Sequence, residues 1–267
     1  MSALLLRNLH IAEANLINSG FLVGGPAILP SMMFAHALGR SLGGNLPTGI
    51  AYVHHDRVIK GERVYGVIHP QQRRSATYVF EAGKSKDYAS TAKGPTLSLQ
   101  PVANGNLRLS LLIEFSRPID APDEVRHFVS QARLAGGCIE HCDAPQVFPH
   151  VDDALDTVEN GFLVLDRRDL MPRPSEGDPM AALVQHLGQR TDDPQKSWLS
   201  ATHVGYAPIT AIVPRAGARE GYNHAYAEPI VGLVQYRSLR QFTDSAAQAL
   251  WRPQWTPEGI FLLQQSH

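Results

Sequence analysis

The segment that decides the fold reads Arg133-Leu134-Ala135-Gly136-Gly137-Cys138-Ile139, with two adjacent glycines directly after a segment of helical periodicity. Glycine has no Cβ atom, so it allows tight turns and close approach, and it weakens any helix or strand that runs through it. The simpler interpretation is a tight connection between a helix and a strand. The alternative is a backbone surface against which a polyanion such as RNA can lie.

The segments on either side of this turn predict a mixed α and β fold. Apolar clusters predict buried strands, alternating leucines predict a strand with one buried face, and acidic residues after a proline predict a helix start. The expected elements are a strand over 3–11 in the middle of a sheet, a helix from Pro30-Ser31 to Gly43-Gly44, strands over 49–60 and 107–115, a helix from Pro122 to the double glycine, and a strand over 161–166.

The order of these elements is strand, helix, strand, strand, helix, strand. It is the order of the ferredoxin-like fold and of RNA-recognition motifs, in which two helices cover one face of a four-stranded antiparallel sheet. We therefore expect an α+β, ferredoxin-like core over 1–170 that contains a long basic hairpin or thumb-like insertion over 57–99. Residues 171–267 are expected to form a β-rich C-terminal elaboration packed on the core.

Charge is distributed unevenly along the chain. The formal net charge of −1 over 267 residues argues against a polyanion binder that is basic throughout, but it averages two segments of opposite sign. The segment from Glu140 to Asp193 contains twelve acidic residues and four arginines. The segment from Arg57 to Lys93 contains three acidic residues and eight basic ones. This asymmetry suggests one face that attracts phosphate and another that does not, although both segments could also be ordinary solvated surface. The eight basic residues are Arg57, Lys60, Arg63, Arg73, Arg74, Lys84, Lys86 and Lys93.

The sequence indicates the cellular compartment in which the protein is expected. The sequence has no run of about 18 apolar residues, and its start lacks the pattern of a secretory signal. Two cysteines, Cys138 and Cys142, are too few for a disulfide framework. A globular protein of the cytoplasm, with free thiols, is therefore expected.

Two groups of residues have the side chains of metal ligands, but neither has a convincing spacing. His54 and His55 of the run His54-His55-Asp56 are neighbours on an expected strand, so they point to opposite faces and do not readily share one ion. The second group has a Cys-x-x-x-Cys spacing that is looser than a zinc knuckle and has no second cysteine pair. It comprises Cys138, His141, Cys142 and His150. We expect no metal and no other cofactor.

Histidines and a tyrosine raise the possibility of RNA cleavage by acid and base catalysis. The candidates are His10, His36, His54 and His55, together with Tyr52. His36 lies among apolar residues of the first expected helix, where a packing histidine is commoner. Signatures of serine hydrolases, phosphate-binding loops and dinucleotide-binding folds are missing. Stacking aromatic residues are missing from the strand over 3–11 as well, so RNA is expected to be held by loops rather than by the usual sheet face.

Three blocks of sequence resemble the Csy-two family, the Cas-five-type RAMP subunits of type I-F CRISPR surveillance complexes. Weaker similarity appears near residues 161–164, 204–206 and 250–251, so the resemblance touches most of the chain. Residues 143–197 are shorter than is usual in the family, which is also compatible with a compact type I-F variant or a related type IV effector subunit. The three blocks are Leu4 to Asn15, Gly24-Gly25-Pro26 followed by Phe34 to Leu38, and Arg133 to Gly137.

The resemblance implies a non-catalytic subunit that holds the 5′ handle of a CRISPR RNA and caps the backbone filament. Its partners would be the CRISPR RNA, a Cas-seven-type backbone subunit, a large subunit or its substitute, and target DNA near the protospacer-adjacent motif. By resemblance, the basic segment is thumb-like and the double glycine is the RAMP glycine-rich loop, so Arg133, Gly136 and Gly137 join the eight basic residues as RNA-binding candidates. The alternative is a metal-independent endoribonuclease of the same fold that cuts repeat RNA.

Overall fold

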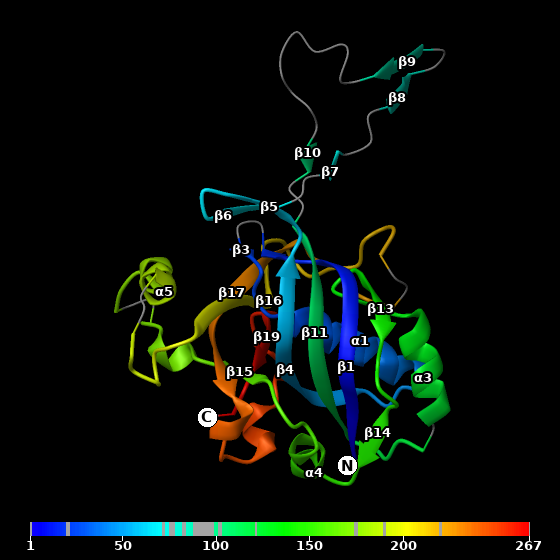
Figure 1. Cartoon of the computed structure of the whole chain (residues 1–267). Helices are drawn as coiled ribbons and strands as arrows, with labels where there is room; N and C mark the ends of the chain where they lie inside the picture. The colour runs from blue at the N-terminus through cyan, green and yellow to red at the C-terminus, as the bar shows by residue number, and fades with distance from the viewer. Residues whose placement is uncertain are drawn as a thin grey trace.

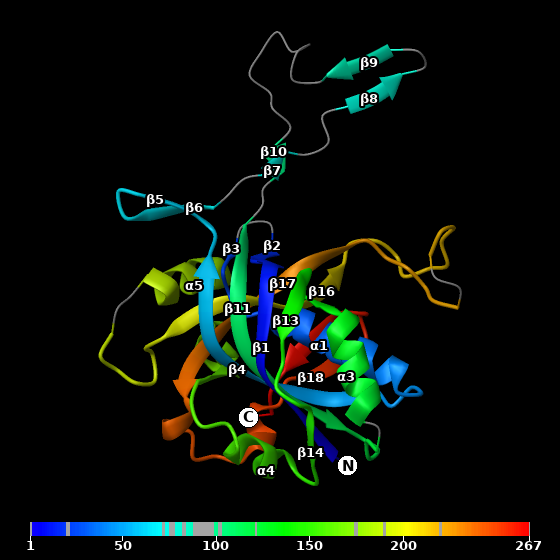
Figure 2. The same ribbon diagram turned by 45° about the vertical axis from the view of Figure 1, so that its right-hand side comes forward.

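The structure is a computed structural model of the chain. It describes residues 2–19, 22–70, 73–74, 78–81, 84–87, 99–100, 103–120, 122–173, 176–188, 191–218 and 221–266, and between 71 and 102 it describes the backbone alone. Figures 1 and 2 show the chain in two orientations. Lys93, one of the predicted RNA-binding residues, lies outside the described residues.

Strands dominate the described part of the chain. The helices are α1 (Ile28–Ser41), α3 (Pro122–Gln131), α4 (Val151–Asp156) and α5 (Pro179–Gly188), with short 3₁₀ turns η1 (Arg168–Leu170), η2 (Leu239–Gln241) and η3 (Ala246–Ala249). The strands of the main sheet are β1 (Ser2–Asn15), β4 (Pro47–Ile59), β11 (Asn104–Phe115), β12 (Arg133–Leu134), β13 (Gly137–His141), β14 (Gln146–Phe148), β15 (Phe162–Asp166), β16 (Leu199–Pro208), β17 (Ala227–Ser238), β18 (Arg252–Trp255) and β19 (Phe261–Gln264). The fold is α+β, with far more strand than helix.

Among the described residues these strands form an 11-stranded sheet, which curls around α1 in Figures 1 and 2. The strand order is β12-β13-β1-β11-β4-β15-β17-β16-β19-β18, and β14 pairs with β1 beside this path. The predicted strands over 3–11, 49–60 and 107–115 correspond to β1, β4 and β11, and β1 lies in the interior of the sheet as expected. The C-terminal strands β16 to β19 continue the same sheet.

The two faces of the sheet are covered differently. On one face, Leu4, Leu6 and Leu9 of β1 pack with α1 and α3 in the largest core cluster. On the other face, a smaller cluster around Leu5 and Leu112 packs under α4 and η3. Leu107, Leu109, Leu111 and Ile113 share the larger cluster, as their alternation predicts.

Strand β1 keeps one face buried although its apolar residues do not alternate strictly. Its pairing with β11 shifts between Leu6 and Leu9 and again between Ile11 and Ala14, and Asn8 and Glu13 at these shifts have positive φ angles of 52° and 56°. A β-bulge adds one residue to one strand and so shifts the alternation of its side chains by one position. Leu9 therefore faces the same side of the sheet as Leu6, although the two are three residues apart. The two bulges therefore explain the irregular spacing.

The helix expected to reach the double glycine ends before it, and the strand expected over 161–166 is not a neighbour of β1. Helix α3 ends at Gln131, before the glycines, and residues 133–138 form a hairpin between β12 and β13. The strand that pairs with the free side of β1 is therefore β13, directly after the glycines. The strand expected over 161–166 exists as β15 but lies beyond β4, on the opposite side. A local apolar pattern predicts that a strand forms. It does not predict which strands lie beside it in the sheet, because that depends on contacts between residues distant in sequence.

The first helix also begins earlier than expected. Helix α1 starts at Ile28, and Pro30 lies within its first turn. Proline is tolerated there because the first amide groups of a helix have no carbonyl partner inside it. The glycine pair after the helix has positive φ angles of 66° at Gly43 and 77° at Gly44, consistent with its role as a stop.

Short strand pairs lie beyond the ends of β4 and β11. Figures 1 and 2 show them standing away from the main sheet. They are β5 (Gly61–Val64) with β6 (Val67–Pro70), β7 (Arg73–Arg74) with β10 (Leu99–Gln100), and β8 (Tyr78–Glu81) with β9 (Lys84–Asp87), and a further small pair, β2 (Ile17–Ser19) with β3 (Leu22–Val23), follows β1.

Candidate nucleic-acid interface

The double glycine marks the end of a two-residue hairpin turn, with Gly136 in the turn and Gly137 beginning β13. Leu134 pairs with Gly137, and the two residues between them, Ala135 and Gly136, have positive φ angles of 50° and 76°. Positive φ at both central positions is the mark of the type I′ turn that suits a tight hairpin. The guanidinium of Arg133 donates to the Gly136 carbonyl at 3.2 Å across this turn.

The two glycines have different surroundings. Gly137 is buried, and a Cβ there would lie 2.5 Å from the Ala12 carbonyl oxygen and 2.6 Å from Ile11 Cγ2. Gly136 is exposed, and a Cβ there would meet only Asn15, at 4.0 Å. Gly137 therefore lets β13 approach β1 closely, and only Gly136 offers backbone to solvent.

The hairpin turn and the base of the basic segment lie at the same end of the sheet. The Asn15 amide donates to the Ala135 carbonyl at 2.8 Å, which ties the turn to the last residue of β1. Two residues earlier, Glu13 forms an ion pair with Lys60, and it accepts from Asn104 Nδ2 at 2.9 Å. Lys60 follows β4, and Asn104 begins β11. The ends of these three strands and the hairpin are therefore joined; we call this region the sheet end.

The predicted basic residues occupy several environments. Arg57 is half-buried and lies against Gly24, where a Cβ would fall 3.2 Å from Arg57 Nη1. Lys60 is half-buried beside Glu13, and Arg63 is exposed on β5. The backbone of the next four lies in strands, namely Arg73 and Arg74 in β7 and Lys84 and Lys86 in β9.

A second set of polar residues lies on the sheet face opposite α1 and α3, and sequence reasoning did not assemble it. Figure 1 shows β1, β11 and β4 in front of α1 on this side, with α4 near the N-terminus. His10 of β1 pairs in register with Arg108 of β11 on one side and with His141 of β13 on the other. His55 of β4 shares this face. We call His10, His55, Arg108 and His141 the open-face cluster.

Hydrogen bonds fix the side chains around the open-face cluster. His55 Nε2 lies 2.7 Å from Ser110 Oγ, which also accepts from the Asn8 amide at 3.1 Å. His141 Nε2 lies 3.1 Å from Asp143 Oδ1, and its ring stands edge-on to that of His10 with centroids 5.1 Å apart. The alternation of Leu9-His10-Ile11 and Leu107-Arg108-Leu109 could have placed His10 and Arg108 on the polar face. The adjacency of their strands could not be read from sequence.

A small cleft opens beside this cluster. It has a volume of about 270 Å³, and it lies between the sheet and the loop that leads from α4 to β15. Asp143 in its wall accepts from Arg7 Nε at 2.9 Å and from Asn8 Nδ2 at 2.9 Å. Burial alone would raise the pKa of Asp143, but these hydrogen bonds, with that of His141, lower it, so the carboxylate stays charged. The lining residues are Arg7, Asn8, His55, Asp143, Thr157, Val158, Glu159 and Asn160.

The candidate acid and base residues are divided between the two faces. The His54 ring packs edge-on against that of Tyr236, with ring centroids 5.1 Å apart, on the helix-covered side. His55 forms its hydrogen bond with Ser110 on the other side. This confirms that the adjacent histidines point apart. Tyr52 is completely buried, and burial raises its pKa well above the usual value of a tyrosine. Burial also lowers the pKa of His54 to about 4, with the charge of Arg57 contributing.

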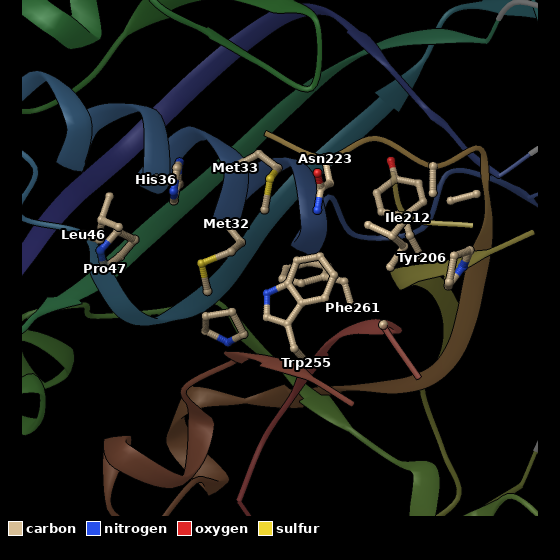
Figure 3. A pocket seen from close by; sticks show the side chains of 15 residues that line it. Met32, Met33, His36, Leu46, Pro47, Tyr206, Ile212, Asn223, Trp255 and Phe261 are labelled. Carbon is tan, nitrogen blue, oxygen red and sulfur yellow. The ribbon is translucent and has the colours of Figure 1, made fainter. Parts of the chain in front are cut away.

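An apolar groove lies on another side of the molecule and has a volume of about 560 Å³. Figure 3 shows Met32 and Met33 of α1 lining it opposite Trp255 and Phe261 of the C-terminal strands. His36 also lines the groove, so it lies apart from His10 and His55. Trp255 is 69% exposed.

The cysteines and their neighbouring histidines do not gather around a common point. Among the described residues, no group of three histidine, cysteine or acidic side chains is placed to hold a metal ion. Both thiols are free; Cys138 is exposed, and Cys142 Sγ lies 3.7 Å from the Arg7 carbonyl oxygen. Burial, with the charge of Asp143, raises the pKa of Cys142 to about 12.

Comparison with known families places this α+β chain among CRISPR-associated proteins. A family model described as CRISPR-associated protein (Cas_Csy2) matches residues 4–262. The chain therefore belongs to the Cas_Csy2 family, as its three sequence blocks predict. No curated protein matches the chain. In the described part of the chain, no helix is long and apolar enough to cross a bilayer.

Proposed function

We propose that the chain is a non-catalytic subunit of a type I-F CRISPR surveillance complex, or of a compact variant or type IV relative, that binds the 5′ handle of the CRISPR RNA. The observation that carries the proposal is the joining of the double-glycine turn to the base of the basic segment at the sheet end. Family membership supports it. The chain would hold and position the CRISPR RNA, because the target sequence is read by base pairing with the guide.

The core that presents this end would be of the ferredoxin-like, RAMP type. Support comes from the chain order β1-α1-β4-β11-α3-β13 and from the sheet order β13-β1-β11-β4, with both helices on one face. Strands β5 to β10 would be the thumb-like insertion. Cationic side chains there would contact phosphates, and the Gly136 backbone would lie against the strand.

The remaining partners follow from this role. Within a cytoplasmic complex, the subunit would cap a filament of Cas-seven-type backbone subunits. It would help a large subunit, or its substitute, to position target DNA near the protospacer-adjacent motif. The proposed domains are 1–170 for the core and 171–267 for the elaboration.

Binding of labelled repeat-derived RNA by the full-length protein, with and without the 5′ handle, tests the proposal. We expect Arg73→Gln with Arg74→Gln to weaken binding and to make the plot of log affinity against log salt shallower by about 1.4, which is roughly 0.7 for each lost phosphate contact with a single strand. Arg126→Gln is a single-charge control away from the sheet end, because this exposed arginine pairs with Asp123 on α3. Equal affinity for RNA without the handle would contradict the proposal.

The endoribonuclease alternative has one favourable observation, namely that His10 and His55 share a face. Against it, Tyr52 is buried and His54 and His36 lie elsewhere. Incubation of the protein with repeat RNA in EDTA separates the two functions. The non-catalytic proposal predicts intact RNA, and cleavage that is lost in His10→Ala would establish the alternative.

A further inference from the structure

The open-face cluster provides donors to anions on a part of the sheet that none of the described helices covers. His10 and Arg108 are both exposed and are opposite one another on β1 and β11. The His141 ring is also exposed, with 55% of its side chain accessible. Four neighbouring strands therefore place imidazole and guanidinium N–H groups over one small area.

Two acidic residues near this area already accept hydrogen bonds from the protein. Asp143 is held by Arg7, Asn8 and His141. Asp56, opposite Arg108 on β4, accepts the amide proton of Arg57 at 2.8 Å. Among the described residues, Arg108 forms no ion pair, so its guanidinium N–H groups can donate to an external anion.

The hydrogen bonds around the cluster hold its histidines in place before any ligand arrives. Ser110 fixes His55, and Asp143 fixes His141, against which His10 packs. Preorganised donors lose little side-chain entropy when they bind a ligand. This restraint applies to the histidines, whereas the exposed Arg108 side chain supplies charge and must be ordered when it binds.

We propose that the open-face cluster binds a phosphodiester group of the RNA, with Arg108 and His10 as donors to the phosphate and the adjoining cleft as the site of one ribose. The proposal rests on the proposed function and extends it from the sheet end to the sheet face. His10 precedes Asn15 by five residues, so the two sites lie roughly 15 Å apart along β1, and one strand can occupy both. The cleft's Asn8, Asp143 and Glu159 can accept hydrogen bonds from ribose hydroxyls.

The test compares single variants of the full-length protein, two of which lose the same positive charge and one of which keeps it. Affinity for fluorescein-labelled repeat RNA that carries the handle is measured by anisotropy across a salt series. We expect Arg108→Gln to reduce affinity about fivefold and to make the salt slope shallower by about 0.7. Arg108→Lys should preserve the slope, and Arg126→Gln should leave both quantities unchanged. Thermal melting checks that each variant is folded.

Crosslinking provides a second readout that does not depend on affinity. RNA with 4-thiouridine at single positions is irradiated on the wild-type protein, and crosslinked peptides are identified by mass spectrometry. We expect crosslinks within β1 or β11 that disappear in His10→Ala with Arg108→Gln. If wild-type protein binds the RNA but Arg108→Gln matches Arg126→Gln and no crosslink falls on β1 or β11, the inference is wrong and the proposed function stands. If wild-type protein binds no RNA, both are wrong.

Discussion

At the residue scale, the two glycines of the hairpin separate structural from functional roles. The sequence predicted a turn here but placed it at a helix end, because helical periodicity does not show where the last turn stops. The positive φ angle of Gly136 belongs to the hairpin turn itself, whereas the close contact of Gly137 with Ala12 depends on β1, which is more than a hundred residues distant in sequence.

Substitutions at the two glycines should have different effects. Gly137→Ala places a Cβ 2.5 Å from the Ala12 carbonyl, so we expect a loss of about 1–3 kcal/mol in the free energy of unfolding. Gly136→Asn should lose less than about 1 kcal/mol, since asparagine tolerates positive φ and the space is open. Urea unfolding measures both, and equal losses would contradict the assignment.

Two tryptophans of the C-terminal region offer a second comparison. Trp251 is completely buried, and its Nε1 donates to the Val164 carbonyl at 2.9 Å, whereas Trp255 is 69% exposed. Trp251→Ala should reduce the free energy of unfolding by about 3–5 kcal/mol, and Trp255→Ala by less than about 1 kcal/mol. A similar loss for both would show that the rim of the apolar groove contributes to the core.

At the element scale, the strands that carry the core could be predicted, but their neighbours could not. The apolar patterns of β1, β4 and β11 are local, so these strands were found with small errors at their ends. The strand that pairs with β1 on the side away from β11 was not predicted, because β13 is short and only Gly137 within it is buried. The open-face cluster was missed for the same reason, since its residues meet only after four strands pair.

An ion pair joins β18 to β11, and its contribution to stability should depend on pH. Arg252 Nη1 lies 2.6 Å from Glu114 Oε2. Burial alone would raise the pKa of Glu114, but the hydrogen bonds from Arg252 and Thr48 outweigh it and lower the pKa. A carboxyl whose pKa is lower in the folded protein stabilises it above the unfolded value of about 4.3 and loses that contribution as the pH falls further.

The stability of wild-type protein should therefore fall more steeply below about pH 4.3 than that of Glu114→Gln. The difference is measured by urea unfolding at a series of pH values from 3 to 7, where the variant should already be less stable at neutral pH. Parallel curves for the two proteins would show that the ion pair makes no titrating contribution.

At the scale of the whole molecule, one sheet connects the proposed core to the C-terminal strands. β15 pairs with β4 and with β17, so hydrogen bonding continues across residue 170. The division at residue 170 and the handle-binding role remain predictions. Net charge gave little guidance, because the basic residues are concentrated in one segment and the acidic ones in another.

The proposed handle-binding role predicts that the protein carries a CRISPR RNA in the cell. Purification of the protein from its native host, followed by sequencing of any RNA that remains bound, tests this. We expect CRISPR RNAs that share one repeat-derived 5′ end, with a raised ratio of absorbance at 260 nm to that at 280 nm. Recovery of the protein without nucleic acid, or with RNA unrelated to the repeats, would contradict it.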